Sequence, residues 1–427
     1  MTRHRLLVIA ATWCLVLAGG GPTSAATAGS TIRVPQDYPT VEDAIRAASR
    51  GDTILLAAGT YDGEITVPQG KPDLTIRGTD RNTVVFDGAG VRNNAIEVEA
   101  DGVTLENLSA HDYLANGFYW DEVSGFAGRG LTVWNVGLYG VYAIQSRGGT
   151  IEQSYVSGAA DAAFYIGECF PCDTVVRGVT AKLSAVGYSG TNAGGNLRIE
   201  DSTFEDNGVG ILPNSYDVGL QAPPQRAATF RHNVVRGSGS VPTPRATPLA
   251  GFTGVGIGVI GGIENVIEDN EITGSARYGI AVTPAIDREA TWTPASNRIE
   301  NNRVSGSGLA DLALARGSGP GNCFVGNTAG TTDPPDLAAD CSATRSGSAA
   351  VADAIALPPP QMLGGLPSAP PFGSMPAPGE LSQLAPDEAV PAGPPLAAAA
   401  AAVVLLLGLG GLFVLFRFRR KRDQPIA

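Results

Sequence analysis

The chain has 427 residues, of which 56 are glycine and 30 are proline, and only 16% are charged. These values exclude a coiled coil or a basic nucleic-acid-binding protein as a description of the whole chain. The 41 acidic residues outnumber the 29 basic ones, for a net charge of −12 at pH 7. We therefore expect no nucleic-acid partner, and calcium is possible as a bridge to any highly anionic polymer.

The first segment of the chain predicts export. Residues 6–18 are mostly apolar, follow Arg3 and Arg5, and precede small residues that offer cleavage sites near residue 26. This order is typical of a secretory signal peptide, which we place at residues 1–26.

A short helix is predicted soon after the signal peptide. Thr40 is a suitable N-cap, and Val41, Ala44, Ile45 and Ala48 lie on one face. Strand edges at the end of a β-sheet stack invite aggregation unless they are covered. We expect this helix to cap the N-terminal end of such a stack.

Nine similar segments follow, and the clearest read IEQSYV, IEDSTF, FRHNVV, IEDNEI and IENNRV. They begin at Val103, Leu131, Ile151, Val175, Ile199, Phe230, Ile267, Ile299 and Phe324. Each unit holds at least two short strands and cannot bury its apolar face alone, whereas stacked units can. We predict an all-β fold, a parallel β-helix over residues 31–342. The turn residues Asn233, Asn270 and Asn302 are expected to bond along the stack, and a β-sandwich is the alternative.

The stretch TIRVPQDYPTVEDAIRAASRGDTILLAAGTYDGEITV resembles the start of the right-handed parallel β-helix superfamily. This superfamily includes pectate-lyase-like and periplasmic copper-protein NosD-like repeat proteins. The resemblance implies a right-handed helix. The enzyme motifs NTD, GHG, RIK, DFIFG and WIDH are absent, so no catalytic residue carries over. Copper binding is not expected, because only His111 and His232 follow the signal peptide.

Four tyrosines recur at equal spacing. Tyr119, Tyr142, Tyr165 and Tyr188 are 23 residues apart, and the alternation of strand residues places all four on one outer face. With Asp121 and Glu168 beside them, they form the predicted ligand-binding set. A strip of such rings suits a short oligosaccharide, although stacked tyrosines also stabilise a sheet without any ligand.

Catalytic candidates are few. Asp161 and Asp206 are expected in one turn column, two coils apart, where side chains could approach the spacing of an inverting glycoside hydrolase. Turn aspartates usually bond to nearby backbone instead, so the question of catalysis stays open. His111 and Asp112 are adjacent in sequence and are interpreted as a solvated turn, and no metal site is predicted.

Four cysteines remain after the signal peptide, an even number that favours disulfides in an exported protein. The most local pairing joins Cys169 with Cys172 and Cys323 with Cys341. A single CxxC with two histidines in the rest of the chain makes zinc the less favoured interpretation.

The C-terminal part predicts membrane anchoring. Residues 343–395 are rich in proline and alanine and indicate a disordered spacer. Residues 396–416 are uncharged and long enough to span a bilayer, and the basic residues 417–427 predict a cytoplasmic tail. We expect a single-pass cell-membrane protein whose extracellular β-helix binds carbohydrate or another cell-envelope component. A polysaccharide lyase or glycoside hydrolase and a structural or adhesive surface solenoid are the alternatives.

Overall fold

The computed structural model describes residues 29–244, 251–287, 290–335, 337, 346–355, 378–379 and 381. The chain divides into two units, Met1–Gln383 and Leu384–Ala427, and all described residues belong to the first. The predicted signal peptide, membrane span and cytoplasmic tail lie outside the described residues. Within the described part, no helix has the length and apolar character needed to cross a membrane.

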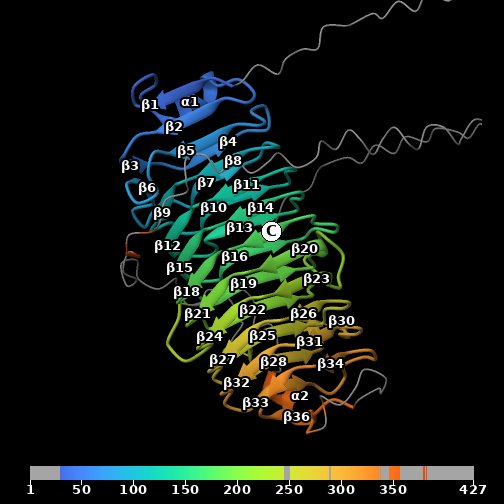
Figure 1. The fold of residues 1–427 in the computed structure, drawn as a ribbon. Coiled ribbons are helices and arrows are strands. Elements are labelled where there is room, and N and C mark those ends of the chain that lie inside the picture. Colours follow the sequence, from blue (N-terminus) through green and yellow to red (C-terminus); the bar gives the residue numbers. More distant parts are fainter. Residues whose placement is uncertain are drawn as a thin grey trace, which may run out of the picture. The chain divides into compact units, whose positions relative to one another are not determined.

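Three parallel sheets run along the stack of coils (Figure 1). Sheet 1 contains β1 (Thr31–Val34), β2 (Thr53–Leu56), β5 (Thr75–Gly78), β8 (Thr104–Glu106), β11 (Ala127–Arg129), β14 (Thr150–Glu152), β17 (Val175–Arg177), β20 (Gly194–Glu200), β23 (Arg226–Arg231), β26 (Val266–Glu268), β31 (Arg298–Glu300) and β34 (Cys323–Val325). Sheet 2 contains β3 (Gly59–Asp62), β6 (Val84–Asp87), β9 (Ser109–His111), β12 (Thr132–Val136), β15 (Tyr155–Ala159), β18 (Thr180–Lys182), β21 (Thr203–Glu205), β24 (Val234–Arg236), β27 (Glu271–Thr273), β32 (Arg303–Ser305) and β35 (Thr328–Ala329).

Sheet 3 contains β4 (Ile65–Val67), β7 (Asn94–Val98), β10 (Asn116–Asp121), β13 (Val141–Ile144), β16 (Ala162–Gly167), β19 (Val186–Thr191), β22 (Val209–Asn214), β25 (Val255–Ile260), β28 (Tyr278–Thr283), β33 (Ala310–Leu314) and β36 (Thr332–Asp333). A separate antiparallel hairpin joins β29 (Ala285–Asp287) to β30 (Ala290–Trp292). Each full coil thus contributes one strand to each sheet. The predicted parallel β-helix is confirmed, with three strands per coil.

The register of sheet 1 corrects three of the predicted repeat starts. Leu105, Gly128, Ile151 and Val176 pair in sequence along the inner face of the sheet. Val103, Leu131 and Val175 are therefore not equivalent positions. For Leu131 the reason is Gly128, where a Cβ atom would lie 2.9 Å from both Leu131 Cδ1 and Trp120 Cη2, so neighbouring side chains already fill the inward position. A search for repeated apolar residues does not recognise a glycine at the inward position and takes a neighbouring apolar residue as the repeat start instead.

Stacked amides line two corners of the coils. Asn233 donates to Asn270 (3.1 Å) and Asn270 to Asn302 (2.9 Å), which confirms the predicted ladder between sheets 1 and 2. A second ladder, which the sequence analysis missed, lies between sheets 3 and 1. It consists of Gln225, Asn265, Asn297 and Asn322, joined by bonds of 2.8, 3.0 and 2.8 Å. Each amide also bonds to the backbone of an adjacent coil, so these buried polar groups are satisfied.

Helices lie at both ends of the stack (Figure 1). At the N-terminal end lies α1 (Val41–Ala47), and Thr40 is its N-cap as predicted, with a side chain that accepts a hydrogen bond from the Asp43 N–H. At the other end, α2 (Ala349–Ile355) packs against β28 and buries Val351. The prediction of a disordered spacer from residue 343 is therefore wrong for this helix, because its apolar side covers the outer face of sheet 3.

The outer face of sheet 3 changes character along the stack. In the C-terminal coils a second hydrophobic cluster forms on it, and Phe252, Trp292 of the hairpin and Val351 of α2 cover the strands there. In the N-terminal coils the same face carries Tyr119 and Tyr142, which are partly exposed. The candidate site lies where this cover ends.

Candidate functional site

Three of the four predicted tyrosines form one ladder on the outer face of sheet 3. Tyr119 pairs with Tyr142, and Tyr142 pairs with Tyr165, in the register of β10, β13 and β16. The Tyr119 and Tyr142 ring centroids are 4.6 Å apart at an interplanar angle of 21°. Those of Tyr142 and Tyr165 are 5.1 Å apart with the rings edge to face. One ring per coil is confirmed for these three positions.

Tyr188 does not belong to this ladder, and the prediction that it faces outward is wrong. It pairs with Phe164, is fully buried, and packs against Phe230 inside the coil. Ser189 takes the outward place next to Tyr165. The strands β16 and β19 are offset by 24 residues, since Ala162 pairs with Val186, and a shift of one residue moves a side chain to the opposite face.

Tyr139 completes the cluster and was missed in the sequence. Its ring stacks on Tyr142 with centroids 4.4 Å apart and lies 4.9 Å from Tyr165. It precedes β13, where its N–H donates to the side chain of Asn116 one coil earlier (3.3 Å). Because the neighbouring coil holds an asparagine at this position, no repeated aromatic pattern marks Tyr139.

The stacking decides which parts of the rings a ligand can reach. Rings that stack along the helix axis cover one another's faces, so they present mainly their edges and hydroxyl groups. Tyr165 is only 6% exposed. Its ring lies across Gly167, where a Cβ atom would come within 2.2 Å of the ring. No other described ring contacts Tyr119, so the open ring face of the cluster is the one on the Glu97 side of Tyr119.

Asp161 is the most perturbed carboxyl group of this site. It lies directly before β16, is 7% exposed, and burial raises its pKa to about 7. The Tyr139 hydroxyl is its hydrogen-bonding partner and partly counteracts this rise by favouring the ionised form. A carboxyl group in this state can donate and accept hydrogen bonds near neutral pH.

Two further carboxyl groups border the tyrosines. Burial raises the pKa of Asp121, which shares a hydrogen bond with Tyr119. Burial also raises the pKa of Glu168 to about 7, although it accepts hydrogen bonds from the Gln221 N–H (2.9 Å) and the Asn192 side chain (3.3 Å). Among the described residues, no lysine or arginine contributes to these three shifts.

The predicted turn shared by Asp161 and Asp206 is present, two coils apart, but the two residues do not stack at equivalent positions of it. Lys182 pairs with Glu205, which aligns Asp206 with Leu183 in the turn after sheet 2. Asp161 instead bonds through its backbone oxygen to the Val186 N–H at the start of sheet 3. Both aspartates therefore lie in the turn between sheets 2 and 3, but Asp206 begins this turn directly after β21 and Asp161 ends it directly before β16.

The two carboxyl groups with a pKa near 7 do not form a hydrolytic pair either. Asp161 and Glu168 stand at opposite ends of β16, seven residues apart. At about 3.3 Å per residue their Cα atoms are roughly 23 Å apart. Glycoside hydrolases hold their two carboxyl groups about 5 to 9.5 Å apart.

The predicted disulfide between Cys169 and Cys172 is confirmed. It closes the loop directly after Glu168, where Arg226 lies 3.8 Å over the ring of Phe170. Cys323 is also disulfide-bonded, and Cys341, its predicted partner, lies outside the described residues.

Comparisons with known proteins agree with this architecture. Residues 116–283 match the family model described as the right handed beta helix region. This match and the three parallel sheets together indicate a right-handed parallel β-helix, the fold that the sequence resemblance implied. No curated protein matches the chain.

Several solved structures are similar to this β-helix. An alginate lyase from Paenibacillus sp. matches 63% of this chain and 95% of its own, with a TM-score of 0.47 and 16% identity. The A-module of a mannuronan C-5 epimerase from Azotobacter vinelandii matches 67% of this chain and 84% of its own, with a TM-score of 0.44 and 15% identity. An exopolygalacturonase from Thermotoga maritima matches 64% and 78%, with a TM-score of 0.42 and 8% identity.

Proposed function

We propose that this β-helix binds an uncharged carbohydrate on the outer face of sheet 3, across Tyr119, Tyr142 and Asp121, with Asp161 buried beside them. The observation that carries the proposal is the placement of desolvated carboxyl groups, free of basic neighbours, at the edge of a partly exposed tyrosine cluster. Carbohydrates combine apolar C–H surfaces with many hydroxyl groups. A tyrosine offers both an apolar ring and a polar tip.

The negative charge on the outer face of sheet 3 favours neutral carbohydrates over anionic ones. Asp121 and Glu168 add negative charge whenever they ionise, and a uronate-rich polymer would need a cation to approach them. Sugar hydroxyl groups, in contrast, donate to carboxylate oxygens and accept from protonated ones. The proposed ligand is therefore a neutral saccharide, and catalysis is not part of the proposal, because Asp161 and Glu168 are too far apart for hydrolysis.

The location of the protein is part of the same proposal. The signal-like residues 1–26 and the apolar residues 396–416, followed by a basic tail, support a cell-membrane protein with the β-helix outside. Protease treatment of intact spheroplasts should then remove the β-helix and leave a tag after residue 427. Loss of the tag with an intact β-helix would reverse the orientation.

A glycan array probed with the full-length protein in detergent tests the binding function, followed by calorimetry on any neutral saccharide that binds. Tyr119→Ala removes the open ring face and should weaken binding by about 1 to 3 kcal/mol, as at other aromatic hot spots. Tyr155→Ala is the matched control, because Tyr155 is a partly exposed tyrosine on sheet 2. The proposal is contradicted if no neutral saccharide on the array binds the protein. It is also contradicted if Tyr119→Ala lowers the melting temperature but leaves the affinity unchanged, because the tyrosines would then have a structural role only.

A further inference from the structure

A second group of polar side chains lies on sheet 2, away from the tyrosine cluster. Asp87 ends β6, His111 ends β9, and Asp112 follows in the next turn. Asp87 pairs with His111 in the strand register, so their side chains lie on neighbouring coils and on the same face. The interpretation of His111 and Asp112 as a solvated turn did not include Asp87, since only the folded register brings it beside them.

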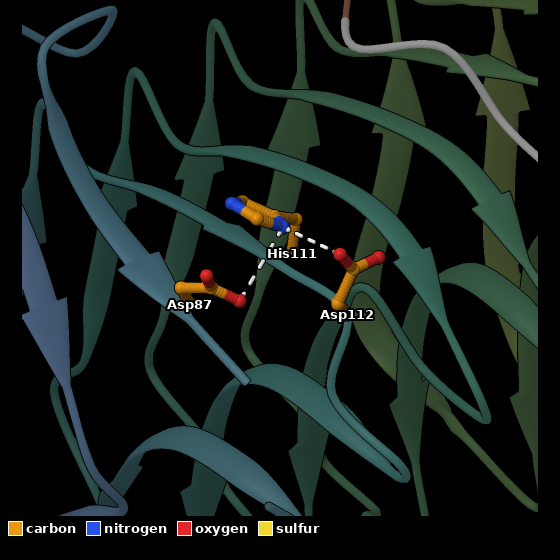
Figure 2. Close-up of side chains that lie close together, drawn as sticks. All are labelled: Asp87, His111 and Asp112. Carbon is orange, nitrogen blue, oxygen red and sulfur yellow. Dashed lines mark hydrogen bonds and ion pairs between the residues drawn. The ribbon is translucent and has the colours of Figure 1, made fainter. Parts of the chain in front are cut away.

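One nitrogen of His111 faces both carboxyl groups (Figure 2). Its Nδ1 lies 3.0 Å from Oδ2 of Asp112 and 3.8 Å from Oδ1 of Asp87. The three potential ligand atoms lie within 4.8 Å of one another. A Zn²⁺ ion, which binds nitrogen and oxygen ligands at about 2.0 to 2.2 Å, would bridge both separations. The other ring nitrogen points away from the two carboxyl groups, as Figure 2 shows.

Neighbouring side chains hold two of these groups in place. Trp134, one coil further along, stacks on the His111 ring with centroids 4.4 Å apart at 18°. The side-chain amide of Asn135 donates to Oδ1 of Asp112, which leaves Oδ2 directed at the imidazole. Contacts of this kind orient the ligands of metal sites and raise their affinity for the ion.

The local charge favours a cation between the three side chains. Two carboxyl groups face a single Nδ1, which carries at most one proton. Arg92 is close, but its guanidinium bonds to the main-chain oxygen of Asp87 (3.0 Å) and not to the carboxylate. Oδ1 of Asp87 accepts a hydrogen bond from the Ala89 N–H (2.8 Å), which fixes the side chain without neutralising it.

We propose that Asp87, His111 and Asp112 bind one divalent transition-metal ion of the zinc class. One imidazole nitrogen with two carboxylate oxygens suits such ions, whereas calcium takes six to eight oxygen ligands. Three protein ligands leave a coordination position for water or for an oxygen atom of a bound molecule. The three side chains are 34%, 19% and 26% exposed, so solvent can reach that position.

Metal binding is measured on the full-length protein, prepared without a polyhistidine tag and stripped with a chelator. Co²⁺ should bind with a stoichiometry of one, give visible absorption bands, and be displaced by Zn²⁺. Because Trp134 stacks on the ligating ring, Co²⁺ should also quench tryptophan fluorescence. His111→Gln and Asp87→Asn should each weaken binding about tenfold or more while the circular dichroism spectrum is unchanged.

The chain contains a matched control. His232 also lies between two aspartates, but its Nδ1 faces Asp201 (3.4 Å) and its Nε2 faces Asp269 (3.9 Å), so one ion cannot use both. His232→Gln should leave binding unchanged, and Trp134→Phe should keep binding but abolish most of the quenching. Failure of the wild-type protein to bind either ion in stoichiometric amount would overturn the proposal, as would equal affinity in His111→Gln.

Discussion

The raised pKa of Asp161 makes the stability of the β-helix depend on pH in a specific way. The pKa of this carboxyl group is about 7 in the folded protein against 3.8 for a free aspartate. The folded state therefore holds a proton between pH 4 and 7 that the unfolded chain has lost. Stability falls as pH rises through this window, and the loss is complete above the folded pKa. Each pKa unit corresponds to about 1.4 kcal/mol, so this group alone accounts for a fall of roughly 3 kcal/mol between pH 5 and 8.

Asp161→Asn tests this coupling, since asparagine resembles the protonated acid and does not titrate. At pH 5 we expect a free energy of unfolding within about 1.5 kcal/mol of the wild type, the range typical of small changes in hydrogen bonding. At pH 8 the variant should gain roughly 3 kcal/mol relative to the wild type, because it no longer buries a charge. Urea unfolding followed by circular dichroism at both pH values gives the two differences. Glu168 titrates in a similar range but is present in both proteins, so its contribution cancels.

A second variant separates burial from the effect of the neighbouring hydroxyl. Tyr139→Phe removes the group that favours the ionised form of Asp161, so the pH window of the stability loss should move upward. A difference between Asp161→Asn and the wild type that stays constant from pH 5 to 8 would refute the reasoning. It would mean that Asp161 ionises in the folded protein as it does in the unfolded chain.

Three other substitutions test the packing that supports the site. Asn270→Ala interrupts the amide ladder and removes the acceptor of the buried Asn233 N–H and the side-chain donor to the Phe230 oxygen, so urea unfolding should show a loss of about 1 to 3 kcal/mol or more. Gly167→Ala places a methyl group within 2.2 Å of the Tyr165 ring and should lower the melting temperature. An unchanged value would show that the ring does not lie over this glycine. Arg81→Met removes hydrogen bonds that reach the next coils, including one of 2.7 Å to the Leu131 oxygen, and should cost a few kcal/mol measured by the same unfolding assay.

The coil architecture was predictable because its signals are repeated. Stacked turns select asparagine at Asn233, Asn270 and Asn302, and a capped amphipathic helix at Thr40 marks the start of the stack. Each signal occurs where any stack of parallel strands must satisfy a buried polar group or cover an edge. These requirements do not depend on the exact length of any coil. The fold prediction therefore stays correct even where a single repeat is misaligned.

The site was less predictable because it depends on register. Thr150 pairs with Val175, an offset of 25 residues, whereas Val141 pairs with Phe164, an offset of 23. Turns of different length accommodate these differences in offset, and no sequence motif marks where a turn is longer. The 23-residue spacing of Tyr188 from Tyr165 therefore does not reflect the strand register. The approach of Asp87 to His111 could not be predicted from the sequence, because no repeated pattern aligns these two residues.

The place of the tyrosine cluster follows from which coils carry insertions. Sheet 3 has an apolar outer face wherever the hairpin β29–β30, the segment around Phe252 and α2 cover it, and all of these lie in the C-terminal coils. The coils with Tyr119 and Tyr142 have short turns, and none of the described residues covers them in this way. Their outer face must contact water and still pack against the coil above it. Tyrosine meets both conditions, since its ring stacks on the next coil while its hydroxyl remains hydrogen-bonded. Any ligand of sheet 3 must therefore bind at these N-terminal coils, because further along the stack the protein's own residues already occupy the same face.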